Sequence, residues 1–139
     1  MTRQPPDGTD AESVLRILVV DDNQLIRDAL TQVIEHYADM QVVGRAGNAE
    51  DALRLLEELR PDVVILDLHM PGPDGLYILK TLRAQGNQAV VMIFTAYSHH
   101  QYRMECTRLG ADFFFSKTLD NERLFTTLLA LTKKRTNID

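Results

Sequence analysis

The chain has 139 residues, the size of one ordinary globular domain, with 45% hydrophobic and 25% charged residues. Its formal net charge of −5 at pH 7 argues against non-specific binding to nucleic acid or to an anionic membrane. The single cysteine, Cys106, excludes an intramolecular disulfide, and no apolar stretch approaches the ~18–20 residues of a membrane-spanning helix, so we expect a cytoplasmic protein.

The N-terminal residues 1–14 contain two prolines, three acidic residues and no apolar core. They match neither a secretory signal nor an Arg-rich transit peptide. We therefore expect a flexible leader over residues 1–14, one folded domain over residues 15–132 and a C-terminal tail over residues 133–139.

Short apolar runs, typical of strands buried on both faces of a sheet, alternate with longer segments of helical spacing. We expect strands over 17–20, 41–46, 63–66, 90–94 and 113–116, of which 41–46 is less apolar and so lies at a sheet edge. Between and after them we expect helices over 23–37, from Asn48 to Pro61, around 76–82, over 98–109 (more polar than the others) and around 124–129. Asn48 caps the second helix, with Asp51 as an approximate capping box; Gly86 and Gly110 end the third and fourth, and Asp120 or Thr118 caps the fifth. This alternation predicts a single-domain α/β fold with a mainly parallel sheet, right-handed crossovers and helices on both faces.

Polar or charged side chains stand directly after four of the five predicted strands. Asp21 and Asp22 follow the first strand, and Asp67 follows the third. Thr95 follows the apolar run of the fourth, and Lys117 follows the fifth. Because the carboxyl ends of parallel strands face the same edge of a sheet, we expect these five side chains to converge.

Three carboxylates that lie close together repel one another, and a hard divalent cation relieves that repulsion. Mg²⁺ favours one or two carboxylates plus water and phosphate, and Mn²⁺ is the alternative cation. The Lys117 ammonium and the Thr95 hydroxyl suit the oxygens of a phosphoryl group, while a carboxylate attacks as nucleophile. The residues thus predict formation of an aspartyl phosphate; the alternative is a polar cap on the strand ends, with Lys117 as a salt-bridge partner.

These residues, in this order, resemble the receiver domain of two-component response regulators. The resemblance covers about residues 15–132 and rests on Asp21-Asp22, Asp67 with Met70-Pro71-Gly72 and Asp74-Gly75, Thr95-Ala96 and Lys117. It implies a flavodoxin-like (βα)5 fold with a five-stranded parallel sheet in the order 2-1-3-4-5.

The resemblance also implies a role for each site residue. Asp67 would be the phosphoacceptor, receiving phosphate from a histidine on a sensor histidine kinase or a histidine phosphotransfer protein. Asp22, Asp67 and the backbone carbonyl of His69 would bind Mg²⁺, with Asp21 acting largely through water. Thr95 and Lys117 would hold the phosphoryl oxygens.

The resemblance further implies a switch aromatic three residues before the lysine. That position is Phe114, where the family commonly has tyrosine, and Thr118 follows the lysine where the family often has proline. A cis Lys117–Thr118 bond would cost ~3 kcal/mol or more, because the cis form is accessible at low cost only before proline.

His69 and Tyr97 occupy positions that flank the phosphoryl group in the family and tune its hydrolysis. We interpret His69 as an exposed loop histidine, with a poised acid or base as the alternative. Tyr97 either packs on the loop or screens the acyl phosphate from water. Two bulky rings beside Asp67 predict slow self-hydrolysis.

The expected function is a phosphorylation-controlled switch of protein–protein interactions in a phosphorelay. Closure of Thr95 and Lys117 around a phosphate would shift the face built by the fourth helix, fifth strand and fifth helix, and the first helix would dock the phosphodonor. The chain ends about ten residues after its last apolar helical position, so we expect no output domain. Output would pass through an unknown protein partner, a phosphorylation-dependent homodimer or a phosphate relay, without direct nucleic-acid or membrane contact.

Three other interpretations stay open. The sequence could be the receiver fragment of a longer DNA-binding transcriptional regulator. It could be a Mg²⁺-dependent aspartyl-nucleophile phosphatase, but such enzymes commonly place a second aspartate where His69 stands, so we expect no enzyme beyond self-phosphorylation and slow self-dephosphorylation. It could also be a receiver-like interaction module that needs no phosphate, which an intact set of site residues disfavours.

Overall fold

The computed structural model describes the backbone of residues 14–136 and the side chains of residues 14–133. The expected leader lies outside the described residues except for Val14. The elements are β1 (Leu15–Val20), α1 (Gln24–Ile34), β2 (Met40–Ala46), α2 (Ala49–Leu59), β3 (Val63–Leu66), α3 (Gly75–Ala84), β4 (Val90–Thr95), α4 (His100–Arg108), β5 (Phe113–Ser116) and α5 (Asn121–Thr136). α5 thus continues into the segment that the sequence assigns to a tail.

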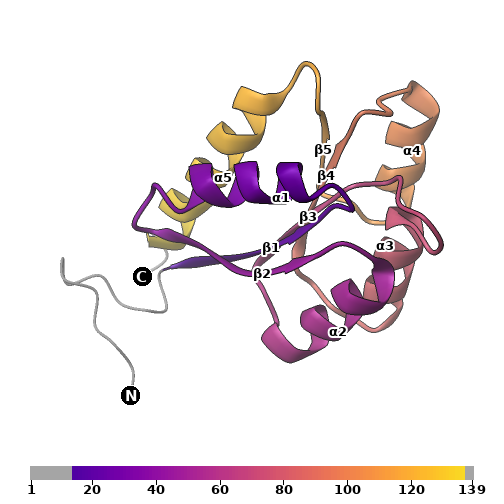
Figure 1. Cartoon of the computed structure of the whole chain (residues 1–139), viewed down its shortest axis with the longest axis horizontal. Helices are drawn as coiled ribbons and strands as arrows, with labels where there is room; N and C mark the ends of the chain where they lie inside the picture. Colours follow the sequence, from indigo (N-terminus) through magenta and orange to yellow (C-terminus); the bar gives the residue numbers. More distant parts are fainter. Residues whose placement is uncertain (1–13, 137–139) are drawn as a thin grey trace.

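The five strands form one parallel sheet in the order β2-β1-β3-β4-β5, which confirms the predicted fold and places β2 at an edge. α1 and α5 cover one face of the sheet, and α2, α3 and α4 cover the other (Figure 1). None of the helices in the described part of the chain is long and apolar enough to cross a membrane.

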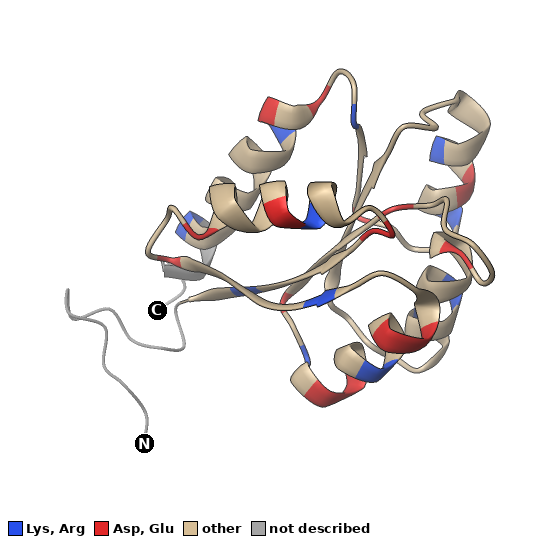
Figure 2. Cartoon of the chain, viewed as in Figure 1, with Lys and Arg blue, Asp and Glu red and all other residues tan. Residues whose placement is uncertain are grey.

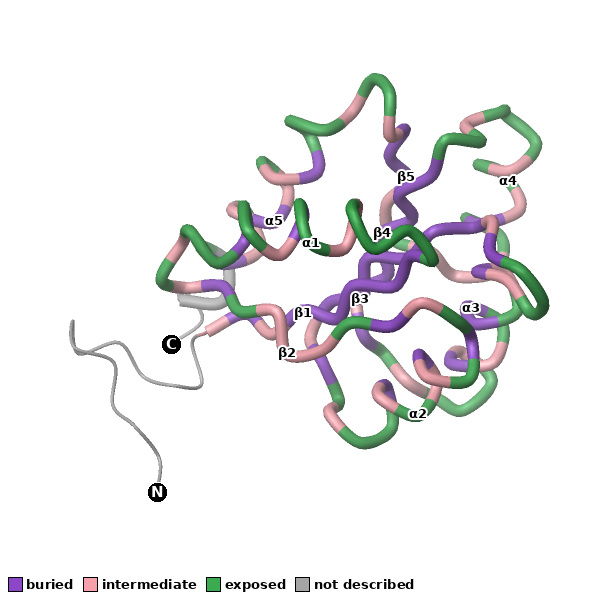
Figure 3. The backbone as a smooth tube through the Cα atoms, viewed as in Figure 1, coloured by how far each residue is buried: buried purple, intermediate pink, exposed green. Residues whose placement is uncertain are grey.

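Side chains on alternate sides of each strand build two separate cores. Ile17 and Val19 of β1 pack with residues of α1 and α5, whereas Leu18 and Val20 pack with residues of α2 and α3. All four are almost completely buried, and burying one such side chain contributes roughly 1.5–3 kcal/mol. β1, β3, β4 and β5 lie inside and the helices expose their outer faces (Figure 3), which explains why these four strands read as apolar runs, whereas the edge strand β2 is partly exposed.

Most of the predicted helix ends are confirmed. The Asn48 side-chain oxygen accepts the Asp51 N–H at 2.8 Å, as in a capping box, and the Asn48 side-chain amide donates to the Asp51 carboxylate at 3.1 Å. α2 ends before Pro61, with Arg60 in the left-handed conformation at φ 48°. Gly86 and Gly110, with φ of 77° and 103°, follow α3 and α4.

Two predicted helices were too long. α1 stops at Ile34 rather than Tyr37, and the N–H of Tyr37 bonds the Ile34 carbonyl in the turn that follows. Tyr37 still packs against the core of α1 and α5, so the apolar periodicity outlasts the helix. α4 spans His100–Arg108 rather than 98–109, with His99 as its N-cap residue.

The segment before α5 uses its polar side chains to fix the loop. The Asp120 carboxylate accepts the backbone N–H of Ser116 at 2.9 Å. The Thr118 N–H donates to Ser116 Oγ at 3.2 Å. These bonds brace the turn that carries Lys117 out of β5.

Candidate phosphoacceptor and metal site

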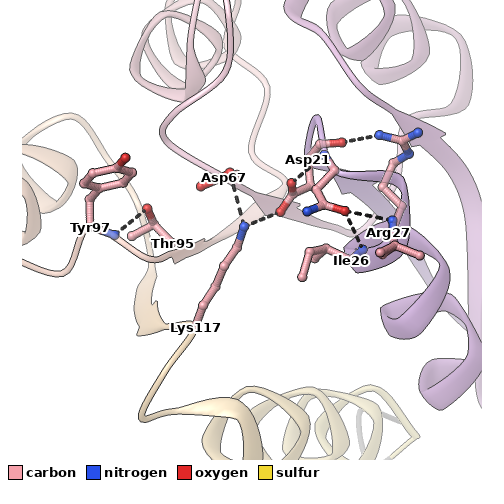
Figure 4. A network of polar contacts seen from close by, with 9 residues as sticks. Asp21, Ile26, Arg27, Asp67, Thr95, Tyr97 and Lys117 are labelled. Atoms are coloured by element: carbon pink, nitrogen blue, oxygen red, sulfur yellow. Dashed lines mark hydrogen bonds and ion pairs between the residues drawn. The ribbon is translucent and has the colours of Figure 1, made fainter.

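The side chains predicted to converge do lie together at the carboxyl-terminal edge of the sheet. Val20 of β1 is level with Leu66 of β3, so the residues that follow them leave the sheet side by side. The Asp67 N–H donates to the Val20 carbonyl oxygen at 3.0 Å. Acidic stretches gather at this edge beside the start of α1 (Figure 2), and Asp21, Asp67 and Lys117 point toward one another (Figure 4).

Three carboxylates form a cluster that could hold a metal ion. One oxygen each of Asp21, Asp22 and Asp67 lies within 4.8 Å of the other two. Asp21 and Asp67 are 2% and 6% exposed, whereas Asp22 is exposed to solvent. Hard oxygen donors in this number suit a divalent cation such as Mg²⁺ or Mn²⁺.

Lys117 reaches into this cluster from the end of β5. Its Nζ lies 2.6 Å from Asp21 Oδ2 and 3.2 Å from Asp67 Oδ2. One ammonium neutralises only one of the two buried carboxylates, so one negative charge remains at a buried position, next to the exposed carboxylate of Asp22. Burial of such charge is costly unless a counter-charge is supplied, which favours binding of a cation here.

The pKa values of the buried pair show this imbalance. Burial raises the pKa of Asp67 above its ordinary value; Lys117 opposes the rise and the Asp21 charge adds to it. Burial alone would lower the pKa of Lys117, but the Asp21 hydrogen bond and the charges of Asp67 and Asp21 outweigh it, and this pKa is raised. The lysine is therefore held as a cation, while the Asp67 carboxylate is less stable as an anion than it would be in water.

The Asp21 carboxylate is engaged at both oxygens. Oδ1 accepts the Asn23 N–H at 3.0 Å and Oδ2 accepts Lys117 Nζ. From one turn into α1, Arg27 donates to the Asp21 backbone carbonyl at 2.5 Å. Sequence reasoning missed Arg27, because its spacing marks only a position on an amphipathic helix.

Thr95 is fully buried at the end of β4, on the opposite side of Asp67 from α1 (Figure 4). Its Oγ1 accepts the backbone N–H of Tyr97 at 3.1 Å. That bond uses an acceptor lone pair of the hydroxyl and leaves its proton available for donation.

The interpretation of His69 as an exposed loop histidine is wrong. The residue is half-buried, and its ring stacks on Tyr97 with centroids 3.7 Å apart and planes 17° apart. Tyr102 of α4 meets it edge-on at 5.4 Å. Packing by two rings from other segments, which local polarity does not reveal, explains the error. Tyr97 packs on the loop, which was one of the two interpretations of this residue, and 46% of its surface is exposed.

Phe114, the expected switch aromatic, is 8% exposed and packs with the core of α2 and α3. The guanidinium of Arg103 lies over its ring, with Cζ 4.6 Å from the centroid. Arg103 also donates to the Phe114 carbonyl oxygen at 3.4 Å. The Lys117–Thr118 bond is trans, since the described residues contain no cis peptide, so the expected cost of a cis bond does not arise.

Gly75 explains the Asp74-Gly75 motif in physical terms. A Cβ at this position would lie 2.1 Å from the Asp67 carbonyl oxygen. The Gly75 N–H donates to the Leu68 carbonyl at 3.0 Å, and Asp74 caps α3 by accepting the Tyr77 N–H at 3.2 Å. The missing side chain thus lets the start of α3 close against the Asp67 backbone.

Comparison with known proteins agrees with this geometry. The response regulator receiver domain family matches residues 17–129. The nitrate/nitrite response regulator protein NarL of Escherichia coli K12 is 35% identical over 112 residues, which cover 81% of this chain and 52% of NarL. The chain spans about half the length of the curated relatives it matches first.

Solved structures show the same likeness. A LuxR-family two-component response regulator from an Aurantimonas species has a TM-score of 0.80 at 30% identity, over 88% of this chain and 87% of that chain. The response regulator domain of Thermotoga maritima CheB has a TM-score of 0.77 at 30% identity, over 91% and 98% of the two chains. The chain belongs to the response regulator receiver domain family.

Proposed function

We propose that Asp67 accepts a phosphoryl group from the phosphohistidine of a sensor histidine kinase or phosphotransfer protein, and that the chain works as a cytoplasmic switch of protein–protein interactions. The observation that carries this proposal is the placement of Asp67. Its carboxylate is buried beside a second buried carboxylate and 3.2 Å from an ammonium. A purely structural cap would need only one buried carboxylate beside Lys117, whereas two share it here.

We propose Mg²⁺ as the cation, with Mn²⁺ as a substitute, because the donor set consists of hard oxygens. Asp21 has both carboxylate oxygens in hydrogen bonds to protein groups. We propose Asp22, Asp67 and the backbone carbonyl of His69 as the direct ligands, with Asp21 acting through water. When bound, the cation offsets the negative charge of the incoming phosphoryl oxygens.

The positions of the side chains support the following transfer step. A carboxylate oxygen of Asp67 forms a bond to phosphorus as the bond from phosphorus to the histidine nitrogen breaks, and the released imidazole takes up a proton from solvent. Lys117 exchanges its contact with Asp67 for one with a phosphoryl oxygen, and the Thr95 hydroxyl donates a hydrogen bond to another phosphoryl oxygen.

The phosphate then biases a two-state element. Drawing Thr95 toward the phosphate changes the packing beside Phe114, and with it the face of α4, β5 and α5. We propose that this face serves an unknown output protein or a phosphorylation-dependent homodimer, and that α1 receives the phosphodonor. NarL, of which this chain covers 52%, and a DNA-binding LuxR-family response regulator from Staphylococcus aureus, 28% identical with a TM-score of 0.78, support the second candidate: the receiver part of a longer DNA-binding transcriptional regulator.

We do not expect catalytic turnover of phosphate esters. A phosphatase of this chemistry needs a group that protonates the leaving group, commonly an aspartate two residues after the nucleophile. His69 stands at that position, stacked under Tyr97. Steady release of phosphate from a monoester would contradict this part of the proposal.

Acetyl phosphate labelling with Mg²⁺, read by intact mass, tests the proposed function. We expect one phosphoryl group on the native protein, and none on Asp67→Asn or in the presence of EDTA. Asp28→Asn is the matched control, because Asp28 is an exposed aspartate of α1 paired only with Arg45 in the described contacts. Size-exclusion elution of the labelled protein reports dimer formation.

A further inference from the structure

Three rings from three separate segments meet beside the Asp67 loop: His69 before α3, Tyr97 before α4 and Tyr102 within α4. We call them the aromatic cluster. His69 stacks on Tyr97 at 3.7 Å, and Tyr102 lies edge-on to His69 at 5.4 Å and to Tyr97 at 6.5 Å. The cluster therefore joins α4 to the loop that follows the phosphoacceptor.

The His69 ring owes its position to these neighbours. Its Nδ1 is buried and has no hydrogen-bond partner among the described residues. An unpaired buried nitrogen provides no anchor, so stacking and edge contacts hold the ring. Tyr97 in turn is tied to the site through its backbone N–H, which donates to Thr95 Oγ1 at 3.1 Å.

α4 is otherwise loosely attached. Cys106 is its one fully buried residue, and its N-cap residue His99 makes no side-chain capping bond within the described structure. A helix with few buried side chains and no cap opens at low free-energy cost. The edge contacts of Tyr102 are thus a substantial part of what holds its first turn.

The residue after Tyr102 links the same turn to the switch aromatic. Arg103 covers the Phe114 ring at 4.6 Å and bonds its carbonyl. Two successive residues of α4 therefore contact both parts of the site: Tyr102 contacts the loop after the phosphoacceptor, and Arg103 contacts Phe114 of β5.

We propose that Tyr102 is a positioning residue that holds the His69–Tyr97 pair against the Asp67 loop and couples the phosphorylation of Asp67 to the docking of α4. This inference rests on the proposed phosphoacceptor function. Without the Tyr102 ring, His69 and Tyr97 lose the edge-on contact that holds them in place. Water then reaches the acyl phosphate on Asp67 more often, and the phosphoryl group is lost faster. The protection of α4 from solvent also stops responding to phosphorylation.

The test compares Tyr102→Leu and Tyr102→Phe with the native protein. Each is labelled with acetyl phosphate and Mg²⁺ and freed of donor, and loss of the label is followed by intact mass. Aromatic contacts of this kind predict a roughly two- to tenfold faster loss in Tyr102→Leu. Tyr102→Phe keeps the ring and should retain the native rate. The control Tyr77→Leu removes a half-exposed tyrosine of α3 outside the aromatic cluster.

Hydrogen exchange of residues 100–108, with and without label, supplies a readout that a purely structural role would not change. We expect labelling to alter exchange of α4 in the native and Tyr102→Phe proteins, and to have little effect in Tyr102→Leu. If Tyr102→Leu is unfolded by circular dichroism, Tyr102→Met replaces it. A native rate and a native exchange response in the ringless variant would overturn this inference alone, whereas a native protein that takes no label would overturn the proposed function as well.

Discussion

Replacing Lys117 with methionine isolates the electrostatic balance of the site. The substitution keeps an unbranched side chain but removes the ammonium that lies 2.6 Å from Asp21 and 3.2 Å from Asp67. The three side chains are 17%, 3% and 7% exposed, so solvent screens the contacts weakly. Removing one partner of a buried ion pair costs about 3–5 kcal/mol.

The expected loss is at the lower end of that range, about 3 kcal/mol at pH 7 without metal. Part of it is recovered because burial already raises the pKa of Asp67, so this carboxyl can take up a proton once its cation is gone. Saturating Mg²⁺ should reduce the difference further, since the cation replaces the missing charge and binds only the folded site.

Urea unfolding in EDTA and in Mg²⁺ measures both effects, with the exposed Lys80→Met as the matched control. We expect Lys117→Met to be destabilised in EDTA and to gain more stability from Mg²⁺ than the native protein does. Equal stability of Lys117→Met and the native protein in EDTA would refute the idea that Lys117 compensates buried carboxylates.

Three further predictions concern the residues around Asp67. Burial raises the folded-state pKa of Asp67, so the stabilisation that its protonated form provides is fully present below the unfolded pKa of about 4 and is lost as pH rises through the folded-state pKa. In EDTA, Asp67→Asn should therefore be more stable than the native protein at pH 7. Thermal unfolding should show that this difference disappears near pH 4. Gly75→Ala should cost about 1–3 kcal/mol in urea unfolding and slow acetyl phosphate labelling, because its Cβ would lie 2.1 Å from the Asp67 carbonyl oxygen; an unchanged labelling rate would contradict that contact. The combined His69→Asn and Tyr97→Glu variant should lose its phosphoryl group several-fold faster than the native protein, since the stacked pair is gone, and equal half-lives would remove the case for a slow native hydrolysis.

The convergence of the site was predictable because a parallel sheet has only one carboxyl-terminal edge. Once the strands before Asp21, Asp67 and Lys117 were recognised, their alternation with helices required these side chains to meet. The edge position of β2 followed in the same way from its weaker apolar pattern. Local capping chemistry at Asn48 needed no tertiary information.

The details that decide the behaviour of the site were not predictable from local pattern. His69 follows Asp67 by two residues in a polar loop, and only the fold brings Tyr97 and Tyr102 onto its ring. The ion pairs of Lys117 depend on contacts 50 and 96 residues apart in the chain. Tyr37 misled the prediction of α1 for the same reason, since it packs on the core from outside the helix.

Locating the phosphoryl group after acetyl phosphate treatment tests the central claim most directly. Peptide mapping of the labelled native protein should place the group on Asp67, with labelling dependent on Mg²⁺ and absent from Asp67→Asn. A label found on Asp21 or Asp22, or one that persists undiminished in Asp67→Asn, would contradict the assignment of Asp67 as the phosphoacceptor.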